Sequence, residues 1–180
     1  LMHVNNETGQ IQPIQELGRE LAKKNVLFHV DATQSCGKLV NELRQTSYNM
    51  LSFSAHKLRG PQGVGVLVLK KSHYRLPPVK PIMYGGQQEH GIRPGTVPVA
   101  LVAGCGMACE LAEQHHENDH QKMVAIKELI YELLEKSGIQ YSINGDEQTC
   151  ICNTLNICFY GVSSEALMIM TKKCVALQNL

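Results

Sequence analysis

Lys57 and Asp31 are the two residues of this chain whose types and spacing are best suited to chemistry. Lys57 ends the segment Met50-Leu-Ser-Phe-Ser-Ala-His-Lys57, and Asp31 follows the apolar residues 26–30, so that 26 positions separate the two. If these segments are neighbouring parallel strands, the amine and the carboxylate emerge at one edge of the sheet. An amine forms an imine with the aldehyde of pyridoxal phosphate (PLP), and a carboxylate keeps the ring nitrogen protonated. The pair therefore predicts a PLP site.

Further motifs surround this pair. In chain order they are Met2-His-Val-Asn-Asn-Glu-Thr-Gly9, His29-Val-Asp-Ala-Thr-Gln-Ser35, Ser54-Ala-His-Lys57, Gly60-Pro-Gln-Gly-Val-Gly65, Gly85-Gly86 with Glu89, and Arg93-Pro-Gly-Thr96. On these motifs the sequence resembles the cysteine desulfurases, which are PLP enzymes of the class V aminotransferase group. The resemblance covers essentially the whole chain. Two later stretches, Val97-Pro-Val-Ala100 and Gly161-Val-Ser-Ser-Glu-Ala-Leu167, are most similar to the branch that supplies sulfur for DNA phosphorothioation.

The resemblance implies both a fold and a reaction. The fold is that of the PLP-dependent transferases (aspartate aminotransferase-like): part of an α/β large domain with a mostly parallel sheet, plus part of a smaller α+β domain. The reaction converts L-cysteine to L-alanine and passes the sulfur, through a cysteine persulfide, to a sulfur-acceptor protein. The resemblance also implies a homodimer, in which Thr96 reaches the phosphate of the PLP bound by the second subunit.

The resemblance also assigns roles to the residues around the ring. Lys57 carries the cofactor and shuttles the substrate Cα proton, and Asp31 pairs with the ring nitrogen. Gln34 and Asn6 donate hydrogen bonds to the phenolic oxygen of the ring. The phosphate is expected to be held by Ser54 and His56.

Five of these residues also have a simpler structural role open to them. Lys57 alone could be a surface lysine after a strand. Asp31 could cap a helix, because Ala-Thr-Gln-Ser follows it, and this role is compatible with cofactor binding. Gln34 and Asn6 could each be turn residues, and the Thr96 hydroxyl could belong to a turn after Arg-Pro-Gly.

A desulfurase also needs a thiolate on a mobile loop to attack the sulfur of the substrate. The resemblance places that loop after residues 175–180, so we expect this chain to lack it. We expect it to lack the N-terminal Thr/Glu phosphate segment, the histidine that stacks on the ring and the arginine that clamps the substrate carboxylate as well. The chain is therefore predicted to be a truncated central portion with little turnover of its own. Alternatives are a non-catalytic remnant that acts as a dimerisation or interaction module, and a selenocysteine lyase-like class V enzyme.

The chain has seven cysteines, an odd number without the density of a disulfide scaffold. Reduced thiols in a cytoplasmic protein are the expected state. Four of them lie in apolar or small-residue runs and are predicted to be core thiols: Cys36, Cys105, Cys109 and Cys158. Cys174 lies near the end of a helical pattern. None qualifies as the nucleophile.

Hydrophobic periodicity outlines the elements that must position these residues. It predicts strands at 1–4, 26–30, 50–54 and 63–69, with a helix from Pro13 to Lys24 and a helix over 98–114. A polar break at 115–119 separates the latter from a second amphipathic helix. Short strands at 141–143 and 154–159 and a helix over 163–173 follow. Alternating strands and helices favour a mostly parallel sheet with residues 1–114 as the PLP-binding portion and 115–180 as the smaller portion.

The composition excludes several other classes of function. A formal net charge of +1 gives no reason to expect direct nucleic acid binding. No apolar run reaches the length of a membrane span. A metal site is possible in principle at Cys150-Ile-Cys152 with His115, His116 and His120, but the Cys-x-Cys spacing is unfavourable for structural zinc. We therefore interpret these histidines as part of a solvated segment between two helices.

Overall fold

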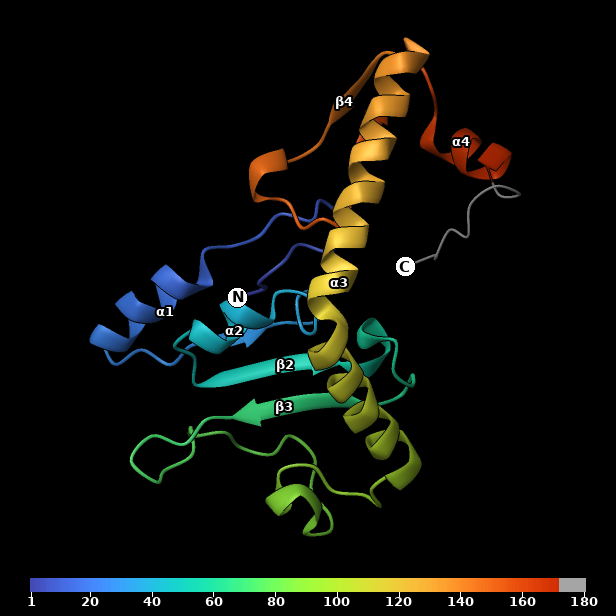
Figure 1. Ribbon diagram of the computed structural model, residues 1–180. Coiled ribbons are helices and arrows are strands. Elements are labelled where there is room, and N and C mark those ends of the chain that lie inside the picture. The colour runs from blue at the N-terminus through green and yellow to red at the C-terminus, as the bar shows by residue number, and fades with distance from the viewer. Residues whose placement is uncertain (172–180) are drawn as a thin grey trace.

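The computed structural model describes residues 1–171 (Figure 1). Its helices are α1 (Ile14–Lys23), α2 (Val40–Gln45), α3 (Val99–Ser137) and α4 (Ser164–Thr171). Its strands are β1 (His29–Asp31), β2 (Met50–Ser54), β3 (Gly65–Leu69), β4 (Tyr141–Ile143) and β5 (Ile157–Phe159). Three short 3-10 helices complete the described part: η1 (Ala55–Leu58), η2 (Gln88–Gly91) and η3 (Glu147–Thr149).

The larger sheet has the strand order β1-β2-β3. β1 and β2 are parallel, as predicted, with Asp31 opposite Ser52. β3 is antiparallel to β2, with Ser54 opposite Gly65. Only residues 55–64 connect β2 to β3, and a parallel crossover needs a connection of a dozen or more residues. The unbroken apolar run at 63–69 also predicts a buried strand, and this prediction is wrong, since 47% of Leu67 and 37% of Val68 remain exposed.

The core lies between this sheet and the helices α1 and α2. It comprises Ile14, Phe28, Val30, Ala32, Leu43 and Leu51. Val30 is completely buried and Ile14 is 1% exposed. Burying an aliphatic side chain of this size stabilises a fold by about 1.5–3 kcal/mol. This packing fixes β1 and β2, and with them the residues at their ends.

The first four residues extend the edge of β1 but form no continuous strand. Met2 forms an isolated parallel bridge with Asp31, and Val4 pairs with Ile11. The amide of His3 donates to the carbonyl of Asp31 at 2.9 Å, and the amide of Asp31 donates to the carbonyl of Leu1 at 2.8 Å. The backbone of Asp31 is therefore held on both sides, by this segment and by β2.

The helix α3 is one continuous element of 39 residues, which contradicts the predicted break at 115–119. The residues of that stretch are polar, but they include neither proline nor glycine, so nothing in them stops a helix. The helix is roughly 58 Å long, and it crosses the sheet and continues well beyond it (Figure 1). It ends at Gly138, whose φ of 68° suits a glycine after a helix. The division at residue 114 therefore falls inside a helix, and remains a prediction.

The part after α3 contains the antiparallel pair β4 and β5, close to the predicted strands. It returns to the N-terminal segment, because Gln10 bridges Cys150 and the amide of Ile151 donates to the carbonyl of Gly9 at 2.9 Å. A Cβ on Gly9 would lie 2.7 Å from Cys150 Sγ, so this contact needs a glycine. The predicted helix over 163–173 is present as α4, and its last two predicted residues lie outside the described part.

Every helix within residues 1–171 is too short or too polar to span a lipid bilayer.

Candidate functional site

The structure places Asp31 and Lys57 at the same edge of the sheet. Asp31 is the last residue of β1, and Lys57 lies in η1, which follows β2 directly. Because β1 and β2 are parallel, both residues emerge at the carboxyl ends of their strands. The amide of Ala32 donates to the carbonyl of Ser52 at 2.8 Å, which keeps the two strands paired up to this edge. The sequence predicted this common edge, where open α/β sheets usually bind their ligands.

The carboxylate of Asp31 is partly engaged. Its Oδ1 accepts a hydrogen bond from the amide of Thr33 at 2.9 Å. This local bond resembles a capping contact, although turns rather than an α-helix follow Asp31. Oδ2 has no hydrogen-bond partner within residues 1–171. One oxygen therefore orients the carboxylate, and the other is available for a ligand.

Ser54 and His56 are also brought together. Ser54 Oγ lies 3.0 Å from His56 Nδ1. Ser54 ends β2, and the exposed His56 lies in η1 beside Lys57. A hydroxyl, an imidazole and an amine within four residues offer three donors that suit a phosphate or another anion.

Gln34 lies in the turn after β1 and is half-buried. Its backbone carbonyl accepts a hydrogen bond from Lys38 Nζ at 3.0 Å, which ties down the turn. The side chain of Asn6 donates to Glu7 Oε1 at 2.6 Å, in the loop that precedes Gly9. Sequence reasoning did not single out Lys38. Burial, followed by the charge of Lys57, lowers the pKa of Lys38 below its ordinary value.

Thr96 is exposed in the segment between η2 and α3. No described contact joins it to Lys57. This is compatible with a role toward a second subunit, and that role remains a prediction.

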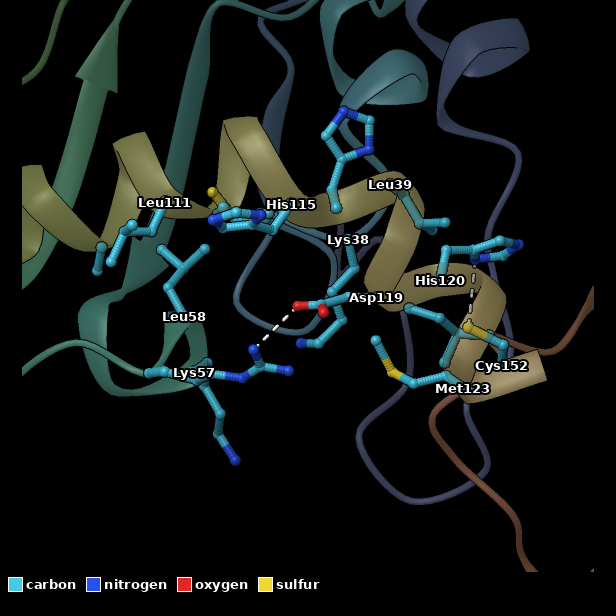
Figure 2. Close-up of a pocket in the computed structure, with 17 residues that line it drawn as sticks. Lys38, Leu39, Lys57, Leu58, Leu111, His115, Asp119, His120, Met123 and Cys152 are labelled. Atoms are coloured by element: carbon cyan, nitrogen blue, oxygen red, sulfur yellow. Dashed lines mark hydrogen bonds and ion pairs between the residues drawn. The ribbon is translucent and has the colours of Figure 1, made fainter. Parts of the chain in front are cut away.

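A cavity of about 200 Å³ lies behind η1, between the turn after β1, the helix α3 and residues 151–152 (Figure 2). Lys57 is among the residues that line it, and Figure 2 shows its amine directed away from Asp119 and Cys152. Arg59 Nη1 is bound to Asp119 Oδ2 at 2.9 Å on the wall of this cavity. The cavity is therefore adjacent to the predicted PLP site, and the amine does not enter it.

The predicted core thiols differ in their environments. Cys105 is 4% exposed, and burial raises the pKa of the Cys36 thiol to about 12. Burial also raises the pKa of Cys109. These three are confirmed as buried or half-buried thiols. The prediction is wrong for Cys158, which is exposed because its side chain points to the opposite face of β5 from its half-buried neighbours Ile157 and Phe159. Cys174 lies outside the described residues.

The histidines considered as metal ligands do not lie in a segment between two helices, so that prediction is wrong. His115, His116 and His120 all lie on the continuous helix α3. His120 Nδ1 is 3.3 Å from Cys152 Sγ, whereas Cys150 Sγ is bonded to the carbonyl of Thr8 at 3.3 Å. Within the described part of the chain, no three histidine, cysteine or acidic side chains are grouped to hold a metal ion.

Comparison with known proteins gives consistent results. The family model of the class-V aminotransferases matches residues 1–178. The cysteine desulfurase of Homo sapiens is 39% identical over 181 residues, which cover 99% of this chain and 38% of that protein. The cysteine desulfurase IscS of Shewanella loihica is 38% identical over 173 residues, covering 96% of this chain and 42% of that protein.

Among solved structures, DndA from Streptomyces lividans superposes with a TM-score of 0.86 at 37% identity, covering 96% of this chain and 48% of that chain. This likeness confirms the predicted fold class. The chain spans less than half the length of each of these three relatives.

Proposed function

Because the chain belongs to the class V aminotransferase family, we propose that it forms the PLP-binding part of a cysteine desulfurase-like protein. The observation that carries the proposal is the position of Asp31 and Lys57 at the carboxyl ends of two paired parallel strands. The Asp31 carboxylate, with one oxygen unpartnered among residues 1–171, matches the ring nitrogen of PLP. The Lys57 amine matches the aldehyde, and the Ser54–His56 pair matches the phosphate. The donor set therefore fits this cofactor.

When bound, PLP supplies a ring that accepts electrons from the substrate. Lys57 holds the cofactor through Nζ and moves the proton at the substrate Cα. Asp31 Oδ2 accepts the hydrogen bond of the protonated ring nitrogen, while Thr33 keeps the carboxylate in place. Ser54 and His56 bind the phosphate, and Gln34 and Asn6 contact the phenolic oxygen.

The substrate of the whole protein is proposed to be L-cysteine, with L-alanine and protein-bound sulfur as products and a sulfur-acceptor protein as partner. The cysteine desulfurases among the relatives support this substrate. The likeness to DndA supports the DNA-phosphorothioation branch. A cytoplasmic location and the division into portions 1–114 and 115–180 belong to the same proposal.

The cofactor part of the proposal is tested by adding PLP to the purified protein and recording its absorption. We expect a band near the edge of the visible range that Lys57→Ala removes. Lys71→Ala is the matched control, because Lys71 is an exposed lysine after β3. A band of equal size in the Lys57→Ala protein would remove the proposal.

A non-catalytic interaction module is the second candidate. It is favoured by exposed apolar side chains in the segment that also carries Thr96: Ile82 is 92% exposed and Tyr84 is 85% exposed. A selenocysteine lyase-like activity is a third. Release of alanine together with sulfide or selenide, measured with L-cysteine and L-selenocysteine, separates the three candidates.

A further inference from the structure

Cys152 and His120 form a thiol–imidazole pair outside the proposed PLP site. His120 lies on α3, and Cys152 lies in the segment between η3 and β5, 32 positions later. Their contact of 3.3 Å joins Cys152 Sγ to His120 Nδ1, and Figure 2 shows both at one end of the cavity. Cys152 is the one cysteine among the six in the described range that forms a hydrogen bond with a histidine.

The environment of this thiol differs from that of the other cysteines. Cys152 is half-buried, and it lines the 200 Å³ cavity together with His120. Burial raises the pKa of Cys152, whereas the charges of Lys127 and Lys38 act in the opposite direction. The thiol is therefore protonated near neutral pH, and a neighbouring base is needed to remove its proton. The imidazole of His120 is in position to do so.

The charge of the cavity indicates which reagent would enter. Its lining includes the cationic side chains of Lys38 and Arg59 and one carboxylate, Asp119, which is bound to Arg59, so Lys38 leaves one positive charge in excess. The excess of positive charge favours anionic molecules.

We propose that Cys152, with His120 as its base, is a thiol–disulfide exchange site for small anionic disulfides that enter this cavity. Cys152 Sγ attacks one sulfur of the disulfide, and its proton passes to His120 Nδ1. The S–S bond of the reagent breaks as the new S–S bond forms. The leaving thiolate then takes the proton from His120. Cys152 is oxidised to a mixed disulfide, and half of the reagent is reduced to a thiol, so no other oxidant is needed.

This site is independent of the proposed PLP chemistry, and its test uses no cofactor. The purified protein is incubated with glutathione disulfide at neutral pH, and the modification of each cysteine is followed by mass spectrometry of its peptides. We expect Cys152 to be modified. We expect His120→Gln to slow this modification at least ten-fold, because an amide accepts a hydrogen bond but does not take up a proton.

Two controls make the result specific. The exposed Cys158, which lies on β5, should react at the same rate in both proteins and so report that the fold is intact. His116→Gln changes a histidine one turn earlier that lines the same cavity, and it should leave Cys152 within two-fold of its original rate. An absence of modification at Cys152, an unchanged rate in His120→Gln, or an equal loss at Cys152 and Cys158 would overturn the proposal.

A second reagent tests the charge of the ligand. Cystamine is a disulfide with two positive charges, and it should modify Cys152 more slowly than glutathione disulfide while showing no such deficit at Cys158. If cystamine reacts with Cys152 as fast as or faster than glutathione disulfide, the assignment to anionic disulfides is wrong.

Discussion

The carboxylate of Asp31 has one oxygen bound to Thr33 and one without a partner in the described chain. Such an aspartate can accept a hydrogen bond from the N–H of a protonated ring while it keeps the hydrogen bond from Thr33 that orients it. Asparagine has nearly the same shape but no charge, so a substitution to asparagine separates the charge from the geometry.

We therefore predict that Asp31→Asn weakens PLP binding. The loss of a charge-assisted hydrogen bond of about 2 kcal/mol corresponds to roughly a thirty-fold higher Kd. The measurement is a titration of the protein with PLP, followed by absorption. Ser52→Ala changes the residue paired with Asp31 on β2 and is the matched control. Equal affinities for Asp31→Asn and the unchanged protein would show that the carboxylate does not contact the ring.

His3 was not singled out by the sequence patterns. Its side chain is completely buried and its Nε2 donates to Glu42 Oε2 at 3.2 Å, while its buried Nδ1 has no hydrogen-bond partner among residues 1–171. Burial lowers the pKa of His3 below 6.5, and the hydrogen bond and charge of Glu42 oppose this only in part. The folded protein therefore holds His3 neutral at pH values where the unfolded chain already binds a proton.

It follows that the free energy of unfolding falls as the pH drops below 6.5, where the unfolded state binds more protons than the folded one. Above 6.5 this contribution is fully present. The slope from one group reaches at most about 1.4 kcal/mol per pH unit. Urea unfolding of the protein and of the His3→Gln variant, at several pH values between 5 and 8, measures how the free energy of unfolding changes with pH. The variant should show a shallower slope below pH 6.5, and identical slopes would contradict the assignment to His3.

At the scale of elements, two helical glycines show how packing can reverse an intrinsic preference. Gly18 lies in α1, where an added Cβ would be 2.4 Å from the carbonyl oxygen of Ser47. Gly106 lies in α3, where an added Cβ would meet nothing within 4 Å. Alanine is preferred over glycine in helices by about 1 kcal/mol when no contact intervenes.

We predict opposite results for the two alanine substitutions. Gly106→Ala should stabilise the protein by up to about 1 kcal/mol, which corresponds to roughly 2–4 °C in Tm for a chain of this size. Gly18→Ala should destabilise it by about 1–3 kcal/mol, because the backbone near Ser47 must move. Thermal unfolding of both variants under the same conditions checks this. A Tm that rises equally in both would mean that α1 does not pack against Ser47 in solution.

The helix α3 joins elements that the sequence pattern separated. Its surface ion pairs, Arg44 with Glu113 and Arg59 with Asp119, connect the helix to the portion that carries Lys57. Such exposed pairs contribute little stability. Of these residues, Asp119 belongs to the predicted break at 115–119, and its ion pair joins this stretch of α3 to the end of η1.

At the scale of the whole molecule, the described chain exposes large apolar side chains, with Ile82 and Tyr84 among the most exposed. Contiguous exposed apolar surface is typical of a contact with another protein. The resemblance implies a homodimer with Thr96 at the interface. We therefore expect the dimer interface to include the segment between β3 and α3, which holds Ile82, Tyr84 and Thr96.

We predict that the double variant Ile82→Asp with Tyr84→Asp weakens self-association at least ten-fold, or about 1.4 kcal/mol. Sedimentation equilibrium measures the association constant. Ile126→Ser is the control, since this side chain is 58% exposed on α3. If the double variant associates as strongly as the unchanged protein, the interface lies elsewhere.

Local sequence was sufficient for the features that depend on neighbours along the chain. The apolar run before Lys57 becomes β2, and the end of the run before Asp31 becomes β1 (His29–Asp31). Residues 32–49, which contain α2, connect the two strands and are long enough for the crossover that a parallel pair needs. The positions of Ser54 and His56 beside Lys57 follow from the same motif. The family resemblance could also be recognised, because its motifs are contiguous in sequence.

Tertiary structure alone decided the features that depend on residues far apart. The burial of His3 beside Glu42, 39 positions away, arises from packing that hydrophobic periodicity does not encode. Periodicity also missed the direction of β3 and the continuity of α3, although the short connection 55–64 and the absence of proline and glycine from 115–119 account for them. The contact between His120 and Cys152 spans 32 positions and exists because residues 150–152 return to the N-terminal segment and lie against α3. Periodicity reports which face of an element is apolar, but the partner of that face is chosen only when the whole chain is packed.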